Sequence, residues 1–450
     1  MDESKELFLN TSPKKLFLKT AIPGAISMLA AMLFSLIDGI FVGQILGDTA
    51  FAAANLAIPF TIINFALAEL IGTGSSVPIS IHLGKGEEKH ANNYFSCACI
   101  LIVLTGILMG VVLYFGAEPI MAFMGADGEF AQMAADYLKV YAICSPITTM
   151  TYALDNYLRI CGKNKISMLL NVLSYGLNIV LDFVFLFVLR LPVWSAALAT
   201  CITMMTATFI GITPFAFKKL QLRFCKPQFS GELFKQIVSS GSPAFLNTVS
   251  GRLTSVVMNM ALLHFGGAPA VAIYGVMMYC GDIVFPLLFG VCNSLQPAIG
   301  YNYGAKRLDR VNQIQKYILI ATAGISIVAI ALLAGVPKIF ASMFLQPDEI
   351  ELLDATARAI RIYSLTFVTR WFGFAIQSLF TALDKPVPAA ILSVGDAFVF
   401  PMILIGVLWK FGLDGLWFNS VFTSLLVAIV AIVLIKKQRK MLSMNKTDFA

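Results

Sequence analysis

The residue with the clearest chemical potential is Asp38, an acid inside a long apolar stretch. It is the only ionisable side chain from Ala21 to Leu46. A helix crosses a bilayer with about 20 apolar residues, and a carboxylate at that depth costs roughly 2.5–3.5 kcal/mol. An acid retained at that cost is typically part of an ion or substrate site, and a polar contact between packed helices is the alternative.

Three stripes of polar residues run along other apolar stretches at helical spacing. Residues three or four apart lie on one face of a helix. The stripes are Asn171, Ser174, Asn178 and Asp182; Glu69, Thr73, Ser76 and Ser80; and Thr248, Arg252, Ser255 and Asn259. Asn178 and Asp182 offer oxygen atoms, which hard cations such as Na⁺ prefer as ligands. The Ser and Thr members serve equally well as helix-packing residues.

The charged side chains within apolar stretches are mostly acidic. The acids are Asp38, Glu69, Asp182, Asp282 and Asp396, and the bases are Arg252 and Arg370. This excess of acids suits cationic cargo or exchangeable protons. Intramembrane charges usually pair, so Arg252 has two candidate partners. Glu69 would make a gate between the two halves of the chain, and Asp282 would make a pair within one half.

These residues must be positioned by membrane-spanning helices. Of the 450 residues, 58% are hydrophobic and 13% are charged, and the mean hydropathy is +0.82. A soluble domain is nearer one quarter charged. The sequence predicts an all-α integral membrane protein with twelve spans, at about 20–46, 51–83, 95–117, 130–157, 166–189, 192–216, 237–265, 268–302, 313–336, 355–381, 387–410 and 414–435.

The net charge of +7 does not indicate a nucleic-acid partner. Lys and Arg gather in short connectors and in both tails, where they set membrane orientation. We therefore expect both termini to be cytoplasmic. The eight cysteines form neither a disulfide framework nor a zinc spacing, and helix packing is their expected role.

The chain also repeats itself weakly. A shift of 220 residues superposes Pro23 on Pro243 and Gly47 on Gly267. Six spans in each half predict two parallel lobes related by a pseudo-two-fold axis along the membrane normal. We expect an N-lobe at 1–216, a cytoplasmic connector at 217–236 and a C-lobe with a basic tail at 237–450.

Several motifs in combination resemble the multidrug and toxic compound extrusion (MATE) transporters, closest to the bacterial branch that includes DinF and MepA. The resemblance covers essentially the whole chain. The motifs are Asp38-Gly-Ile-Phe-Val-Gly-Gln-Ile-Leu-Gly, Leu83-Gly-Lys-Gly, Tyr137-Leu-Lys-Val, Arg159-Ile-Cys-Gly-Lys and Asn178-Ile-Val-Leu-Asp182.

The resemblance implies an antiporter that exchanges H⁺ or Na⁺ for amphipathic, mostly cationic small molecules by alternating access. It implies no other cofactor, a bacterial inner-membrane location and a monomer surrounded by lipid. The residues that it implies for cation or proton coupling are Asp38, Asn178, Asp182, Thr200 and, with poorer alignment, Asn156. The first four of these would also form a possible Na⁺ site. The first helix would bend at Pro23. Other branches carry acids in the seventh and tenth spans, where this chain has Arg252 and Arg370.

The resemblance does not assign the residues that line the substrate cavity or form a gate. The candidates are Glu69, Arg252, Asn259, Asp282 and Gln377.

One alternative function is a lipid-linked saccharide flippase of the same superfamily, which would need more bases than acids in its cavity. An intramembrane enzyme is disfavoured, because the three histidines form no H-E-x-x-H motif and no nucleophile constellation stands out. The sequence also lacks a nucleotide-binding loop, which leaves an ion gradient as the energy source.

Overall fold

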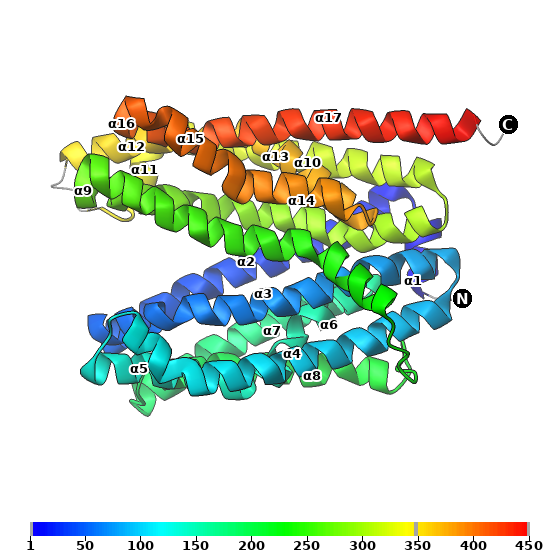
Figure 1. The fold of residues 1–450 in the computed structure, drawn as a ribbon, viewed down its shortest axis with the longest axis horizontal. Coiled ribbons are helices and arrows are strands. Elements are labelled where there is room, and N and C mark those ends of the chain that lie inside the picture. Colours follow the sequence, from blue (N-terminus) through cyan, green and yellow to red (C-terminus); the bar gives the residue numbers. More distant parts are fainter. Residues whose placement is uncertain (1–2, 346–349, 448–450) are drawn as a thin grey trace. The chain divides into compact units, whose positions relative to one another are not determined.

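The chain is helical almost throughout this computed structural model (Figure 1). The structure describes residues 3–345 and 350–447, without the side chains at positions 36, 39, 40, 42–44, 48 and 439–447. Residues 39, 40 and 42–44 of the first motif, and residues 439 and 440 of the basic tail, therefore lie outside the described side chains. Within these described ranges there is no β-strand.

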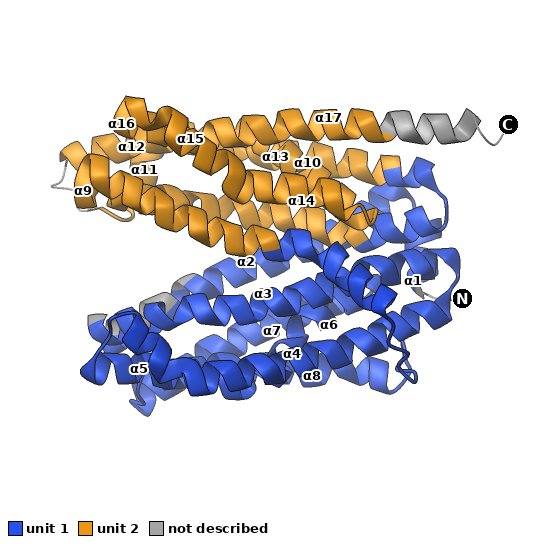
Figure 2. Cartoon of the chain, in the orientation of Figure 1, with its two compact units in different colours: residues 1–245, 297–311 blue, residues 246–296, 312–450 orange. Residues whose placement is uncertain are grey.

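Contacts divide the chain into two compact units (Figure 2). Unit 1 comprises residues 1–245 and 297–311, and unit 2 comprises residues 246–296 and 312–450. One long helix, α9, begins in unit 1, runs through unit 2 and returns to unit 1.

The helices that precede α9 all belong to unit 1. They are α1 (Glu3–Lys5), η1 (Glu6–Asn10), α2 (Pro13–Leu46), α3 (Asp48–Lys85), α4 (Glu88–Phe123), α5 (Gly128–Thr148), α6 (Met150–Ile160), α7 (Asn164–Asp182), η2 (Phe183–Val188) and α8 (Trp194–Ala216).

The helices from α9 onward are α9 (Gly231–Gly304), α10 (Leu308–Gly335), α11 (Pro337–Ser342), α12 (Ile350–Ser364), α13 (Phe367–Ala382), α14 (Pro386–Val394), η3 (Gly395–Val399), α15 (Phe400–Leu408), η4 (Trp409–Phe411), α16 (Gly412–Trp417) and α17 (Asn419–Thr447).

The predicted all-α membrane architecture is confirmed. Among the described residues, nine helices are long and apolar enough to cross a membrane. Helix α9 counts once among them, although its backbone leaves the helical conformation at Gly267 (φ 63°, ψ −159°). The predicted fourth span is divided between α5 and α6, and the predicted tenth between α12 and α13. The number twelve therefore stays a prediction.

Two glycines mark equivalent bends in the two halves of the sequence. Gly47 separates α2 from α3 with φ 83°, and Gly267 bends α9 with φ 63°. Only glycine adopts such positive φ values without a steric penalty. The two positions are those superposed by the 220-residue shift, so the backbone supports the predicted duplication.

Backbone crossings tie the first part of α9 to α3 within unit 1. A Cβ atom on Gly241 would lie 1.9 Å from the Leu70 carbonyl oxygen, and one on Gly74 would lie 2.0 Å from the Ile237 oxygen. Glycines allow such close approach of membrane helices.

The last turns of α9 cross the C-terminal end of α3 in the same way. A Cβ atom on Gly84 would lie 2.0 Å from the Tyr301 oxygen, and one on Gly304 would lie 2.1 Å from the Ile81 oxygen. Contacts therefore group both ends of α9 with unit 1. The lobe boundaries at 1–216, 217–236 and 237–450 stay a prediction about the duplicated halves.

Each unit has its own apolar core. In unit 1, Leu113, Leu138 and Leu186 are at most 3% exposed and belong to one cluster. In unit 2, Leu262 and Leu288 are fully buried in another. Many apolar side chains outside these cores are exposed, as expected for helices that face lipid.

The N-terminal segment packs into unit 1 through Phe8, which is 1% exposed. Its ring lies 5.4 Å from the ring of Tyr301, measured between centroids. Its carbonyl oxygen accepts hydrogen bonds from Asn302 Nδ2 at 3.1 Å and from Arg310 Nη2 at 3.0 Å. Residues near the start of the chain are thereby fixed to the end of α9 and the start of α10.

Candidate functional site

Asp38 of the first predicted span contacts Asp182 of the fifth predicted span. Helix α2 continues through Pro23 and packs against α7, which ends at Asp182. The carboxyl groups of Asp38 and Asp182 form a hydrogen bond with each other. A carboxyl group donates only when it is protonated, so a proton on one of the two groups would satisfy this contact. The bend predicted at Pro23 stays a prediction.

Asn178 and Thr200 complete the surroundings of Asp182, which is fully buried. In the amide orientation that satisfies both of its atoms, Asn178 Nδ2 donates to Asp182 Oδ2 at 2.5 Å. Its Oδ1 then accepts from Thr200 N at 3.0 Å and from Thr200 Oγ1 at 3.1 Å. The π-helix η2 begins directly after Asp182, and such irregular turns are frequent at functional sites.

Two tyrosines of α5 extend this cluster, and sequence reasoning did not assign them a role. Tyr141 hydrogen-bonds with Thr200, and Tyr137 hydrogen-bonds with Tyr141. Both rings are buried, and the charge of Asp38 acts on both hydroxyl groups. Their spacing of four residues was the available signal, because it places both on one helix face.

The cluster therefore combines two carboxyl groups, an amide and hydroxyl groups. Such oxygen donors suit a proton or a hard cation. We call Asp38, Asp182, Asn178, Thr200, Tyr137 and Tyr141 the acid cluster. Four of its members were predicted from the sequence, and the structure places them together within unit 1.

Asn156 forms its hydrogen bond away from the acid cluster. Its Nδ2 donates to a carbonyl oxygen of its own helix at 3.3 Å, and no hydrogen bond from it to the acid cluster is found among the described side chains. Its neighbour Asp155, which sequence reasoning passed over, pairs with Arg159 at 2.8 Å and accepts from Asn171 at 3.0 Å. The i,i+4 spacing of the Asp and Arg was the missed signal.

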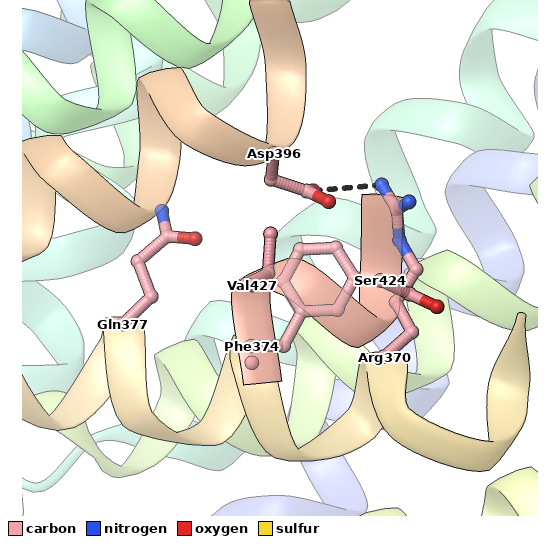
Figure 3. A pocket seen from close by; sticks show the side chains of 7 residues that line it. Arg370, Phe374, Gln377, Asp396, Ser424 and Val427 are labelled. Atoms are coloured by element: carbon pink, nitrogen blue, oxygen red, sulfur yellow. Dashed lines mark hydrogen bonds and ion pairs between the residues drawn. The ribbon is translucent and has the colours of Figure 1, made fainter. Parts of the chain in front are cut away.

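Unit 2 contains a second polar site around Arg370 (Figure 3). Its Nη2 lies 2.8 Å from Asp396 Oδ2, and the two side chains are 18% and 10% exposed. The guanidinium carbon lies 4.9 Å from the ring centroid of Phe285 and 5.4 Å from that of Phe374. Gln377 lines the same pocket.

The remaining candidate cavity residues are divided between the units. Arg252 and Asn259 are exposed side chains on the first part of α9, and the charge of Arg252 acts on Asp282 within unit 2. Glu69 lies on α3 in unit 1. The predicted pair of Arg252 with Glu69 would join the two units and stays a prediction.

Comparison with known proteins decides the family. The family model MatE matches residues 23–184 and again 243–405. The chain belongs to the MatE family. The two matches to MatE begin 220 residues apart, at 23 and 243, which is the shift predicted from the sequence. As a MatE member the chain is a multi-pass membrane transporter and not an enzyme.

Relatives and solved structures of the MatE type align over nearly the full length. Multidrug export protein MepA of Staphylococcus aureus is 24% identical over 99% of both chains. MepA of Staphylococcus haemolyticus is 25% identical over 99% of this chain and 98% of its own.

Two solved structures show that the fold is shared. A crystal structure of MATE in complex with MaL6 has a TM-score of 0.93 at 23% identity, covering 99% of this chain and 100% of its own. A MOP superfamily transporter from Pyrococcus furiosus has a TM-score of 0.91 at 23% identity, covering 98% and 99%. The latter is described by a reversed polarity of its binding pocket that suggests a different function.

Proposed function

We propose that this MatE member exports amphipathic, mostly cationic small molecules in exchange for H⁺ or Na⁺ by alternating access. The observation that carries the coupling role is the hydrogen bond between the carboxyl groups of Asp38 and Asp182. Full-length similarity to proteins named for multidrug export supports the cargo class.

The acid cluster suggests how one site accepts either ion. With a proton on the pair, the amide nitrogen of Asn178 donates to Asp182. With Na⁺ in place of the proton, rotation of the amide by half a turn would present its oxygen to the ion, beside the two carboxylates. Loss of the bound ion to one side of the membrane and its recovery from the other would then drive export.

The setting that we propose is the inner membrane of a bacterium, with a monomer whose two termini are cytoplasmic. The clustering of Lys and Arg in alternate connectors supports this orientation. The bacterial MepA relatives support the location.

The flippase alternative gains no support from the described residues. It requires more bases than acids in its cavity, whereas the embedded acids of this chain outnumber its two embedded bases, Arg252 and Arg370.

Transport in proteoliposomes tests the proposal directly. Purified protein is reconstituted, and a pH gradient or a Na⁺ gradient is imposed alone while an ethidium-like dye is followed. We expect one of the two gradients to drive concentrative dye movement, and an ionophore that collapses that gradient to abolish it. Dye accumulation that neither gradient changes, relative to protein-free liposomes, would remove antiport from the account.

A further inference from the structure

The surroundings of Arg370 in unit 2 are those of a recognition site for an organic cation. Asp396 supplies a carboxylate at 2.8 Å, and Phe285 and Phe374 present aromatic faces within about 5.5 Å of the guanidinium carbon. A carboxylate combined with aromatic faces is how proteins commonly bind ligand cations. Here the cation that occupies the site is a side chain of the protein itself.

Not every hydrogen-bond donor of Arg370 has a partner. Arg370 Nε is buried and has no hydrogen-bond partner among the described residues. A buried donor without a partner costs free energy, and a buried ion pair gains little beyond its desolvation cost. Arg370 is therefore held less tightly than its close ion pair suggests, so a ligand cation can compete for its place.

The backbone around the carboxylate is irregular as well. Asp396 lies in the π-helix η3, between α14 and α15. The hydroxyl group of Thr254 donates to the Ala397 carbonyl oxygen at 2.5 Å. Irregular turns of this kind recur at functional sites because they reposition side chains.

We propose that Arg370 is an internal occupant of a substrate cation site formed by Asp396, Phe285 and Phe374. When Arg370 moves away, the site accepts an amidinium or guanidinium group, whose planar delocalised charge matches that of arginine. The proposal rests on the proposed export of cationic compounds and adds both a site and a chemical class.

Because Arg370 and the ligand would compete for one site, the proposal predicts opposite effects of two substitutions on ligand binding. Removal of the internal occupant strengthens ligand binding, whereas removal of the carboxylate weakens it. If Arg370 and Asp396 only stabilise the fold, both substitutions weaken binding or leave it unchanged. If Arg370 instead holds an anionic group of the substrate, its removal weakens binding of anions and does nothing for cations.

The test measures binding of radiolabelled benzamidinium to the purified full-length protein in detergent. We expect Arg370→Gln to bind about tenfold more tightly than the unmodified protein, because one competing cation is lost. We expect Asp396→Asn to bind about tenfold more weakly. Arg361→Gln is the matched control, since it removes an exposed arginine of unit 2 to which no binding role is assigned, and it is expected to leave the affinity unchanged.

A variant that keeps a cation covers the case in which Arg370→Gln does not fold. Lysine pairs with Asp396 but stacks less well on aromatic rings, so Arg370→Lys is expected to bind benzamidinium moderately more tightly. Weaker or unchanged binding in the folded Arg370 variants, or no binding by any variant, overturns the proposal. Dye export by the unmodified protein is measured separately, so a failure of this site is distinguishable from a failure of the proposed function.

Discussion

The hydrogen bond between Asp38 and Asp182 makes each residue of the acid cluster depend on the others. A shared proton would serve both carboxyl groups, and the amide nitrogen of Asn178 donates to one of them. Groups that act as a unit lose function in a strongly non-additive way. We therefore propose that the cluster acts as one coupling element rather than as a set of independent contacts.

This dependence predicts the outcome of a double-mutant series. Asn178→Ala and Asp182→Asn are each expected to reduce gradient-driven dye transport at least tenfold, and the double variant is expected to be no worse than the poorer single one. Initial rates in proteoliposomes provide the measurement. Glu129→Gln, at an exposed acid, is the control that should remain active, and multiplicative losses in the double variant would contradict the prediction.

Spacing along one helix predicted part of this cluster. The four-residue separation of Asn178 and Asp182 predicted their common face, and the isolation of Asp38 in an apolar stretch made it a candidate functional residue. Partners on other helices are a tertiary property, which spacing alone does not determine. That is why Tyr137 and Tyr141 were missed.

At the scale of elements, glycine crossings decide how α3 and α9 meet. Gly241 allows the two backbones to approach so closely that any side chain there displaces the Leu70 carbonyl group. Sequence patterns located these helices by their apolar length. They did not show which glycines lie at a helix crossing, because glycines also occur in membrane spans where no other helix approaches closely.

We therefore expect Gly241→Ala to destabilise the protein by about 1–3 kcal/mol, the usual cost of overpacking. Gly251→Ala on the same helix is the matched control, because a Cβ atom there meets nothing within 4 Å. That control should be neutral or gain up to roughly 1 kcal/mol of helix propensity. Melting temperatures in detergent compare the two, and equal effects would show that the crossing does not limit stability.

The N-terminal segment provides a second prediction at this scale. Phe8 is buried against Tyr301, so Phe8→Ala is expected to cost about 3–5 kcal/mol locally. Hydrogen exchange of residues 3–12 should rise markedly, while exchange in unit 2 stays unchanged. Phe217→Ala, at a largely exposed ring, is the control. Equal protection of residues 3–12 in both variants would refute the anchoring role of Phe8.

At the scale of the whole molecule, duplication was the most informative sequence signal. The shift of 220 residues recurs in the two matches of the family model and in the positive φ values at Gly47 and Gly267. Hydropathy predicted where spans lie, with α9 bending where a boundary was expected. It did not predict that α5 and α6, or α12 and α13, are separate helices, because a short break leaves the mean hydropathy unchanged.

Orientation can be tested with a native residue. Cys225 lies in the connector between α8 and α9 and is the exposed one among the cysteines that the structure describes. A membrane-impermeant maleimide should label it in inverted vesicles and not in right-side-out vesicles. Cys225→Ser should lose the label, and labelling from the outer side would reverse the proposed orientation.

The central claim is that the proton shared by Asp38 and Asp182 couples the ion gradient to export, and Asp38→Asn tests it most directly. The amide keeps the shape of the carboxyl group and removes its titration. We predict that this variant, reconstituted beside the unmodified protein, still exchanges dye down its concentration gradient but no longer concentrates it under either imposed gradient. Undiminished concentrative transport by folded Asp38→Asn would contradict the account.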